Sequence, residues 1–408
     1  MIFAGRKKVD WLLISCVLML LVFSCLAVYS STSNSQSMNM RENFDKQLVW
    51  IAIGLALATV ISLVPTRWFR EISYLGYAGL VVSLILLDLI SGPTGAHRWF
   101  EWGTIKFQPS EFMKPMLVLT LAHYLSDDDL DPHQLRTLLT VFILALVPFA
   151  LVIKQPDLGT ALTYGVVTIP MLYWRGLKSL VVFIILSPFI TFVASFNFWT
   201  FFFVILLICG VLILSRGGRW MFWGVFLINI FVGILAPQIW GKLHPYQQNR
   251  ILTFLGLVSD PQGAGYQIIQ SKVAIGSGGW LGKGFLHGTQ TQLRFLPAQH
   301  TDFIFSVLAE EWGFFGSMAV LTVFFVFLMR SISVAAATND RFGGLVAVGL
   351  VSLFAFQVVV NIGMTVGIMP VTGLPLPFIS YGGSSMITSL MMAGLLVNIS
   401  IRRFHLYG

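Results

Sequence analysis

The chain has 408 residues, of which 56% are hydrophobic and only 10% are charged, and its formal net charge is +8. Its mean hydropathy of +0.83 is too high for a water-soluble protein of this length, so the composition excludes a soluble enzyme and points to no nucleic-acid partner. We predict an all-α integral membrane protein with a single membrane domain over residues 1–408.

Twelve apolar runs follow one another along the chain, each with about the 17–25 residues that a spanning helix needs. The first run follows basic residues, but it is long, lacks a small-x-small cleavage site and precedes further runs, so we expect it to be retained as a helix. The predicted spans are 11–29, 47–64, 74–91, 109–125, 137–154, 158–174, 179–196, 198–215, 219–237, 303–329, 343–365 and 376–401.

Basic residues are concentrated in the short loops on the side of the N-terminus. This bias predicts that both termini are cytoplasmic, in a multi-pass protein of the cytoplasmic (inner) membrane. The remaining Lys and Arg residues lie in outer loops or near outer helix ends, which favours an anionic ligand on the outer face.

The longest outer loop is predicted at residues 238–302, and it is rich in glycine and basic residues. Runs such as YQIIQSKVAI predict that it is ordered and partly helical. Two shorter outer loops are expected at 91–115 and 366–385. The second has too many prolines and glycines for a regular helix, and irregular backbone at membrane depth must be satisfied by protein or water. We therefore expect it to form a cavity wall.

Asp302 stands where the predicted span at 303–329 begins. Helical spacing places Ser306, then Ala309 or Glu310, and then Gly313 on its face, so the carboxylate is expected to point into the bundle or a cleft. An ionisable group there is a functional candidate, although Thr301 or Asp302 could instead only cap the helix. For Glu310 and Glu311, two turns further in, we favour ion-paired structural roles.

Charged and aromatic residues also gather around the predicted loop at 91–115. Glu111 and Lys114 are neighbours on a helix face, and their spacing fits a buried pair as well as a charged pair that lines a cavity near Asp302. Arg98 can fork onto phosphate oxygens. Trp99 can stack on a sugar, although an interfacial anchor is the favoured interpretation.

Two other patterns are not assigned a ligand. The stretch GSGGWLGKG (276–284) lacks the GxxxxGK[ST] spacing of a nucleotide-binding loop and lies on the predicted outer side. No cluster of residues has the spacing of a metal site, and the cysteines lie within apolar spans, which implies no disulfide framework. The residues concerned are His244, His287, His300, Cys16, Cys25 and Cys209.

Four stretches together resemble one family closely, the SEDS proteins (shape, elongation, division and sporulation), and its elongation branch more than its division branch. They are HRWFEWGTIKFQPSEFMK (97–114), KQPDLGTAL (154–162), GYQIIQSKVAIGSGGWLGKGFLHGTQTQLRFLPAQHTDFIFSVLAEEWGF (265–314) and MPVTGLPLPFISYGGSS (369–385). Family members usually have ten spans, whereas residues 179–237 hold enough apolar sequence for three helices where one is usual. We therefore expect an inserted helix pair.

The resemblance implies a peptidoglycan glycosyltransferase for cell elongation that polymerises lipid II into β-1,4 glycan strands, with a class B penicillin-binding protein as partner. The essential acidic residue of the family falls on Asp302. Its QPSE..K element falls on Gln108–Glu111 and Lys114, and its Arg-Trp pair falls on Arg98 and Trp99.

The implied reaction converts an α-linked undecaprenyl pyrophosphate donor into a β-glycoside, so it inverts the anomeric centre and needs one general base. We assign Asp302 as that base. A divalent cation, Mg or Mn, could help the cations that stabilise the departing pyrophosphate. The expected substrate-binding residues are Arg98, Trp99, Glu111, Lys114, Lys272, Lys283, Arg294 and His300.

Two other functions fit the broad pattern. A lipid II flippase or a secondary transporter also has many spans, intramembrane charges and helices broken by Gly and Pro. Such a protein would be expected to place charges near the membrane midplane and to show a repeat between halves, and no repeat is seen here. A third interpretation is a scaffold without catalytic activity, which a test of the purified chain would separate from an enzyme.

Overall fold

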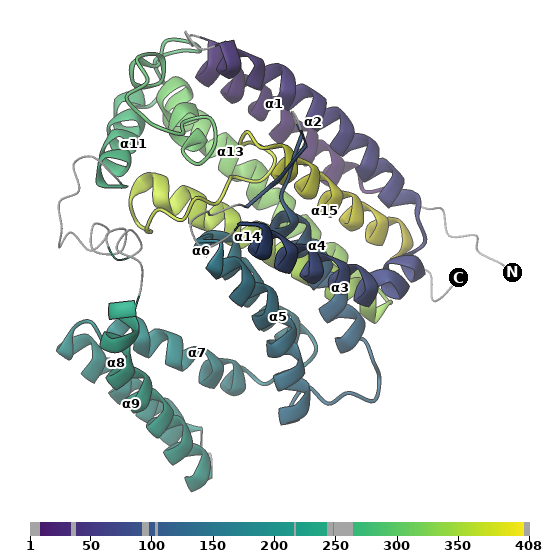
Figure 1. Cartoon of the computed structure of the whole chain (residues 1–408), viewed down its shortest axis with the longest axis vertical. Helices are drawn as coiled ribbons and strands as arrows, with labels where there is room; N and C mark the ends of the chain where they lie inside the picture. The colour runs from purple at the N-terminus through teal and green to yellow at the C-terminus, as the bar shows by residue number, and fades with distance from the viewer. Residues whose placement is uncertain are drawn as a thin grey trace, which may run out of the picture. The chain divides into compact units, whose positions relative to one another are not determined.

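The computed structural model of the chain describes residues 9–33, 38–91, 98–102, 105–215, 218–242, 248 and 264–403 (Figure 1). Two compact units are present, one formed by residues 1–174 with 260–408 and the other by residues 175–259. The predicted outer loop at 238–302 is described only in part, since residues 243–247 and 249–263 lie outside the described residues.

The first unit is almost entirely helical. Its only described strands, Phe100–Trp102 (β1) and Ile105–Phe107 (β2), form an antiparallel pair in which Glu101 faces Lys106. The helices are α1 (Trp11–Ser33), α2 (Met38–Leu63), α3 (Thr66–Ser91), α4 (Pro109–Leu125), α5 (Leu135–Lys154), α6 (Leu158–Trp174), α11 (Ala264–Gly278), α12 (Thr289–Gln292), α13 (Ile304–Ala337), α14 (Arg341–Val366) and α15 (Gly383–Arg402).

The second unit contains α7 (Ser179–Ala194), α8 (Phe198–Leu214) and α9 (Arg219–Lys242). Three helices therefore occupy residues 179–237, as the apolar runs predict. A buried amide joins two of them, because Asn229 accepts a hydrogen bond from Thr191 Oγ1 at 2.7 Å and donates to Ser187 Oγ at 3.0 Å. Such bonds hold helices together where lipid offers no polar partner. That two of the helices are an insertion stays a prediction.

Each of the twelve predicted runs coincides largely with one helix. Within the described residues, eight helices have the length and apolar composition to cross a membrane. The prediction of an all-α integral membrane protein is confirmed, while the count of twelve spans stays a prediction.

The last helix begins later than expected, at Gly383 rather than at residue 376. The prolines and glycines of the segment explain the difference, since they break the helical ladder that the apolar composition suggests. Residues 376–380 form a turn instead, in which the amide of Leu376 is satisfied by Ser380 Oγ at 2.8 Å. The irregular wall predicted around 366–385 is therefore present over residues 367–382, which we call the 367–382 segment.

Helix α13 is broken at Gly313, whose φ of 64° and ψ of −160° are non-helical. The glycine-rich turn after α11 fills the break and exchanges backbone hydrogen bonds with it. These bonds run from Lys283 N to Glu310 O (3.0 Å), Gly284 N to Glu311 O (3.0 Å), Phe314 N to Gly279 O (2.8 Å) and Phe315 N to Trp280 O (3.2 Å). Glycine is required at the contact, because a β-carbon on Gly282 would lie 2.1 Å from the carbonyl oxygen of Glu311.

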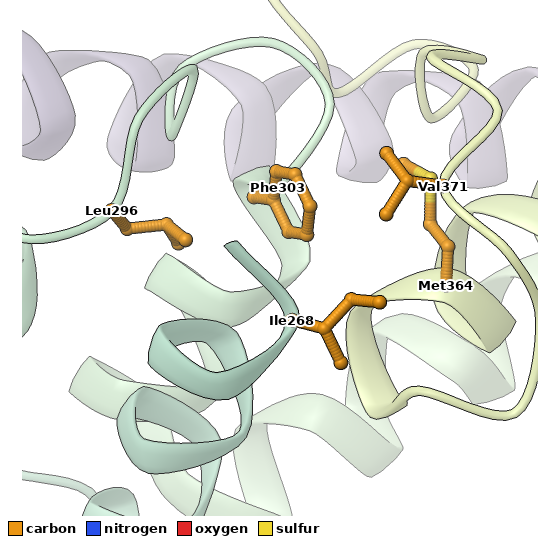
Figure 2. Close-up of a cluster of buried hydrophobic side chains, with 5 residues drawn as sticks. All are labelled: Ile268, Leu296, Phe303, Met364 and Val371. Carbon is orange, nitrogen blue, oxygen red and sulfur yellow. The ribbon is translucent and has the colours of Figure 1, made fainter. Parts of the chain in front are cut away.

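A cluster of buried side chains joins the elements that surround the start of α13 (Figure 2). Phe303 lies at its centre, with Leu296 from the loop before α13 and Ile268 from α11 (Figure 2). Met364 of α14 and Val371 of the 367–382 segment complete it. Because Phe303 follows Asp302 directly, this cluster fixes the backbone that carries the predicted base.

Candidate active site

Asp302 lies in the turn that precedes α13 and is partly exposed. The N-cap position belongs to Phe303, which makes no side-chain cap, so Asp302 is not the N-cap of α13. Asn361 of α14 is fully buried and donates through Nδ2 to the backbone carbonyls of Asp302 (2.9 Å) and Leu374 (2.7 Å). One amide therefore holds the turn with Asp302 against the 367–382 segment.

The carboxylate of Asp302 faces the backbone of Gly373. A β-carbon built on Gly373 would lie 3.6 Å from Asp302 Oδ2, and the φ of this glycine is +76°. Further hydrogen bonds join the same two stretches: Tyr381 N donates to His300 O at 2.9 Å and Ser380 Oγ donates to Thr301 O at 2.6 Å. The irregular 367–382 segment therefore lies directly beside the predicted base, and its role as a cavity wall stays a prediction.

His300 and Arg294 stand on the loop that leads to Asp302. The ring of His300 lies 5.7 Å from that of Tyr381. Burial, together with the nearby charge of Arg294, lowers the pKa of His300 below its usual value, and burial raises the pKa of Tyr381. Arg294 is exposed and adopts a left-handed backbone conformation (φ 61°).

Arg98 hydrogen-bonds to the stretch at 154–162, and Trp99 hydrogen-bonds within its own stretch at 97–114. Arg98 donates through Nε to the carbonyl of Gln155 at 3.0 Å and through Nη2 to that of Pro156. Trp99 Nε1 donates to Gln108 Oε1 at 3.1 Å, and its side chain is 40% exposed. The guanidinium thus binds backbone oxygens at the start of α6, while Trp99 presents much of its ring to the surroundings.

Asp157 completes this network, and the sequence analysis did not single it out. Its carboxylate accepts hydrogen bonds from Thr160 N (3.2 Å) and Thr160 Oγ1 (3.0 Å), and Gln108 Nε2 lies 3.5 Å away. The next turn of α6 approaches the wall beside Asp302, since a β-carbon on Gly159 would lie 2.7 Å from the carbonyl oxygen of Thr372. Its place in the KQPDLGTAL stretch was the signal that could have identified Asp157.

Glu111 and Lys114 form an ion pair of 2.7 Å at the start of α4, with side chains 5% and 0% exposed. Of the two interpretations, the geometry matches an intrahelical pair that hides both charges. Enclosed as it is, the pair would contact a ligand only after the surrounding helices moved apart.

Glu310 is the centre of a second buried polar cluster, and its side chain is fully enclosed. Lys283 Nζ lies 2.9 Å from Glu310 Oε1, and the carboxylate also accepts from Gln290 N (2.9 Å), Thr291 N (3.0 Å) and Thr291 Oγ1 (2.8 Å). Glu311 accepts a hydrogen bond from Ser30 Oγ of α1. The predicted ion-paired structural role matches Glu310, whose partner is Lys283, whereas Glu311 is held by a serine hydroxyl and its ion pairing stays a prediction.

The predicted site residues therefore fall into four groups. Asp302, His300 and Arg294 share the loop that leads to α13, and Arg98 and Trp99 lie on the network at the start of α6, which approaches Thr372 of the 367–382 segment. Lys272 of α11 is exposed and approaches Gly367, the left-handed residue that ends α14. Glu111, Lys114 and Lys283 are held in buried or partly buried pairs. Asn361 was missed, because nothing local to its sequence marks it as a partner of Asp302.

No group of three or more His, Cys, Asp or Glu side chains is placed to hold a metal ion within the described ranges.

The chain was compared with known proteins. A family model described as cell cycle protein, for FtsW, RodA and SpoVE, matches residues 10–202 and 188–405. The peptidoglycan glycosyltransferase RodA of Treponema pallidum is 34% identical, over 98% of this chain and 99% of its own length. The peptidoglycan glycosyltransferase MrdB of Escherichia coli K12 is 35% identical, over 98% and 96%.

Two solved structures share the fold over nearly the whole chain. One belongs to a study of the coordination of polymerization and crosslinking by a peptidoglycan synthase complex, with a TM-score of 0.72, 29% identity and coverage of 97% and 99%. The other is the rod shape determining protein RodA of Thermus thermophilus, with a TM-score of 0.63, 25% identity and 98% coverage of both chains. With the motifs and the fold in agreement, the chain is an integral membrane protein of the FtsW/RodA/SpoVE family, the SEDS proteins.

Proposed function

We propose that this protein is a peptidoglycan glycosyltransferase that polymerises lipid II into β-1,4 glycan strands, with Asp302 as general base. The observation that carries the proposal is the fixed position of Asp302 between the cluster around Phe303 and the backbone of Gly373. The relatives named as peptidoglycan glycosyltransferases match the chain from end to end.

In the proposed reaction, the 4-hydroxyl oxygen of the acceptor sugar attacks the anomeric carbon of the donor. Asp302 takes the hydroxyl proton as the new C–O bond forms, and the bond from the anomeric carbon to the diphosphate breaks. The polyprenyl diphosphate leaves with the electron pair, on the face opposite the attack, so the configuration inverts. A base in this position contributes about 100- to 10,000-fold.

The diphosphate that leaves carries charge that cations must stabilise. Lys272 of α11 and Arg294 of the loop before α13 are both exposed, which makes them better suited to this role than the enclosed Lys114. Two donors of Arg98, Nε and Nη2, already bind the carbonyls of Gln155 and Pro156. To bind the diphosphate as predicted, Arg98 would have to use its other guanidinium N–H groups.

We also propose a class B penicillin-binding protein as partner and an active site on the outer face of the cytoplasmic membrane. The first is supported by a similar chain whose structure belongs to a synthase complex that couples polymerization to crosslinking. The second is supported by the basic residues of the predicted inner loops.

The test is reconstitution of the purified chain with labelled lipid II, with and without the partner and with divalent cations, followed by separation of the products on a gel. We expect glycan ladders from the wild type, their loss with Asp302→Asn, and ladders from Asp128→Asn, a control whose side chain is 86% exposed. Wild-type rates with a folded Asp302→Asn variant would refute the base. No ladders under any condition would refute the polymerase, and transport of lipid II across the same vesicles would then be measured.

A further inference from the structure

A cleft of about 340 Å³ lies between α11 and α13 in the first unit. Its volume is in the range of small-molecule sites. Its walls are apolar or aromatic apart from the hydroxyl of Ser317, and the aromatic part comes from Trp280 and Phe314 at the break in α13. The remaining lining residues are Ile275, Gly276, Gly279, Phe305, Ala309 and Gly313.

The cleft follows one face of α13 from its first turn. Phe305 is the third residue after the predicted base, and Ala309 and Gly313 continue the same face of α13 at helical spacing. The two helices are fixed together near Phe305 by a hydrogen bond of 2.6 Å between Ser271 Oγ and Ser306 Oγ. The cleft therefore runs along α13 from Phe305 to the break at Gly313.

A cation lies on α11 one turn before the cleft-lining residues. Lys272 lies on the same stripe of α11 as the cleft-lining Ile275, Gly276 and Gly279, at spacings of three, four and seven residues. Its side-chain end lies against Gly367, where α14 ends and its dipole is negative. An exposed ammonium group followed by an apolar channel matches an amphiphile with an anionic head.

The cleft is open beside two glycines, Gly276 of α11 and Gly279 of the turn that follows it. A β-carbon on Gly276 or on Gly279 would meet no atom within 4 Å. These positions are therefore lined by free space and not by packed side chains, in contrast to Gly278 on the neighbouring face, where a β-carbon would lie 2.0 Å from Ala309 O.

We propose that this cleft binds the first isoprenoid units of a polyprenyl diphosphate-linked substrate, with Lys272 at the diphosphate. The inference rests on the proposed function, because a lipid-linked donor or acceptor is what brings such a chain to Asp302. The apolar walls would pack against the isoprenoid chain. The ammonium group of Lys272 would donate a charge-assisted hydrogen bond to a phosphate oxygen.

The first test fills the cleft. Gly276→Leu adds a side chain in the open space, and Gly165→Leu is the matched control, because Gly165 of α6 also has no atom within 4 Å of a built β-carbon. For a long-chain lipid substrate we expect Gly276→Leu to raise KM about tenfold, or about 1.4 kcal/mol, because the added side chain fills the space that the isoprenoid units would occupy. A short-chain substrate should be unaffected, and so should the control. An equal effect on both chain lengths, or none, would overturn the proposal.

The second test needs no activity. A polyprenyl diphosphate with a photoreactive group in its first isoprene units is cross-linked to the purified chain, and the labelled residues are mapped by mass spectrometry. We expect labels at 275–280 and 305–314, competition by unlabelled polyprenyl diphosphate, and less labelling with Lys272→Gln. A phospholipid with a photoreactive acyl chain is the comparator, and equal labelling by it would show a general lipid-facing groove and overturn the proposal.

The two tests also separate this inference from the proposed function. Labelling of the cleft by a chain that makes no glycan would support the cleft and refute the polymerase. Glycan ladders with no labelling of the cleft, and no effect of Gly276→Leu, would support the polymerase and refute the cleft as a substrate site.

Discussion

Asn361 holds Asp302 by its backbone, through a hydrogen bond of 2.9 Å from Nδ2 to the carbonyl oxygen. The same nitrogen binds Leu374 O at 2.7 Å, and the residue is fully buried. The predicted base is therefore positioned by an amide that no ligand needs to touch.

Replacing Asn361 with leucine is expected to lower both stability and polymerisation. It strands two carbonyls at a cost of about 1–3 kcal/mol each and frees the turn that carries Asp302. Asn398→Leu is the matched control, since Asn398 is also buried and its Nδ2 also donates to backbone carbonyls, those of Ile61, Ser62 and Val64. Thermal unfolding in detergent and the rate per folded molecule are measured. Equal loss of rate in the two variants would contradict a positioning role for Asn361.

Glu310→Gln is expected to be strongly destabilising, by about 3–5 kcal/mol, because it removes one partner of a buried ion pair and places an amide NH₂ against backbone donors. The exposed pair Lys106–Glu101, with an N–O distance of 2.6 Å, is the comparison. Glu101→Gln should change stability by less than about 1 kcal/mol. The melting temperatures of both variants decide the matter, and similar shifts would show that Glu310 is not the centre of its cluster.

Gly278→Ala and Gly276→Ala are expected to differ sharply although they lie on the same helix. The first methyl group would lie 2.0 Å from Ala309 O and would push α11 away from α13, whereas the second meets nothing within 4 Å. Gly276→Ala should be neutral or slightly stabilising, because alanine favours helix more than glycine does. If α11 moves away from α13, the loop after α11 should be cut faster in limited proteolysis of Gly278→Ala than of Gly276→Ala. Equal cutting rates in the two variants would argue against the close contact between α11 and α13.

Acidification is expected to weaken the loop at His300. Burial and Arg294 lower the pKa of this imidazole below 6.5, so the unfolded chain takes up a proton before the folded chain does. The contribution to stability is complete above about pH 6.5 and is lost as the pH falls through the lowered pKa. His300→Gln should flatten this part of the curve of melting temperature against pH. An unchanged slope in His300→Gln would contradict the assignment.

Much of the fold could be predicted because membrane helices are marked in the sequence by long runs of apolar residues. The runs from 11–29 to 343–365 each found a helix, and the density of proline and glycine identified the irregular segment beside Asp302. The predicted start of the last span, at residue 376, was wrong, because hydropathy alone cannot distinguish a buried irregular segment from a helix.

Long-range pairings could not be predicted from the sequence. Asn361 meets Asp302 across 59 residues, and Glu310 binds backbone amides of Gln290 and Thr291 that belong to another helix. The sequence around Gly313 reads as a continuous apolar helix. The break at Gly313 is explained only by the turn after α11, which hydrogen-bonds to the backbone on both sides of it. In each case the role of the residue depends on a contact with a distant part of the chain, and the neighbouring sequence does not reveal that contact.

The break in α13 also bears on how the chain is assembled during synthesis. The amides of Phe314 and Phe315 bond to carbonyls of Gly279 and Trp280, and in hydrocarbon they would have no water to replace these partners. The glycine-rich turn precedes residues 310–315 in the chain and is therefore synthesised first. We expect the interrupted helix to enter the bilayer only after the backbone groups that bond to its break have been made.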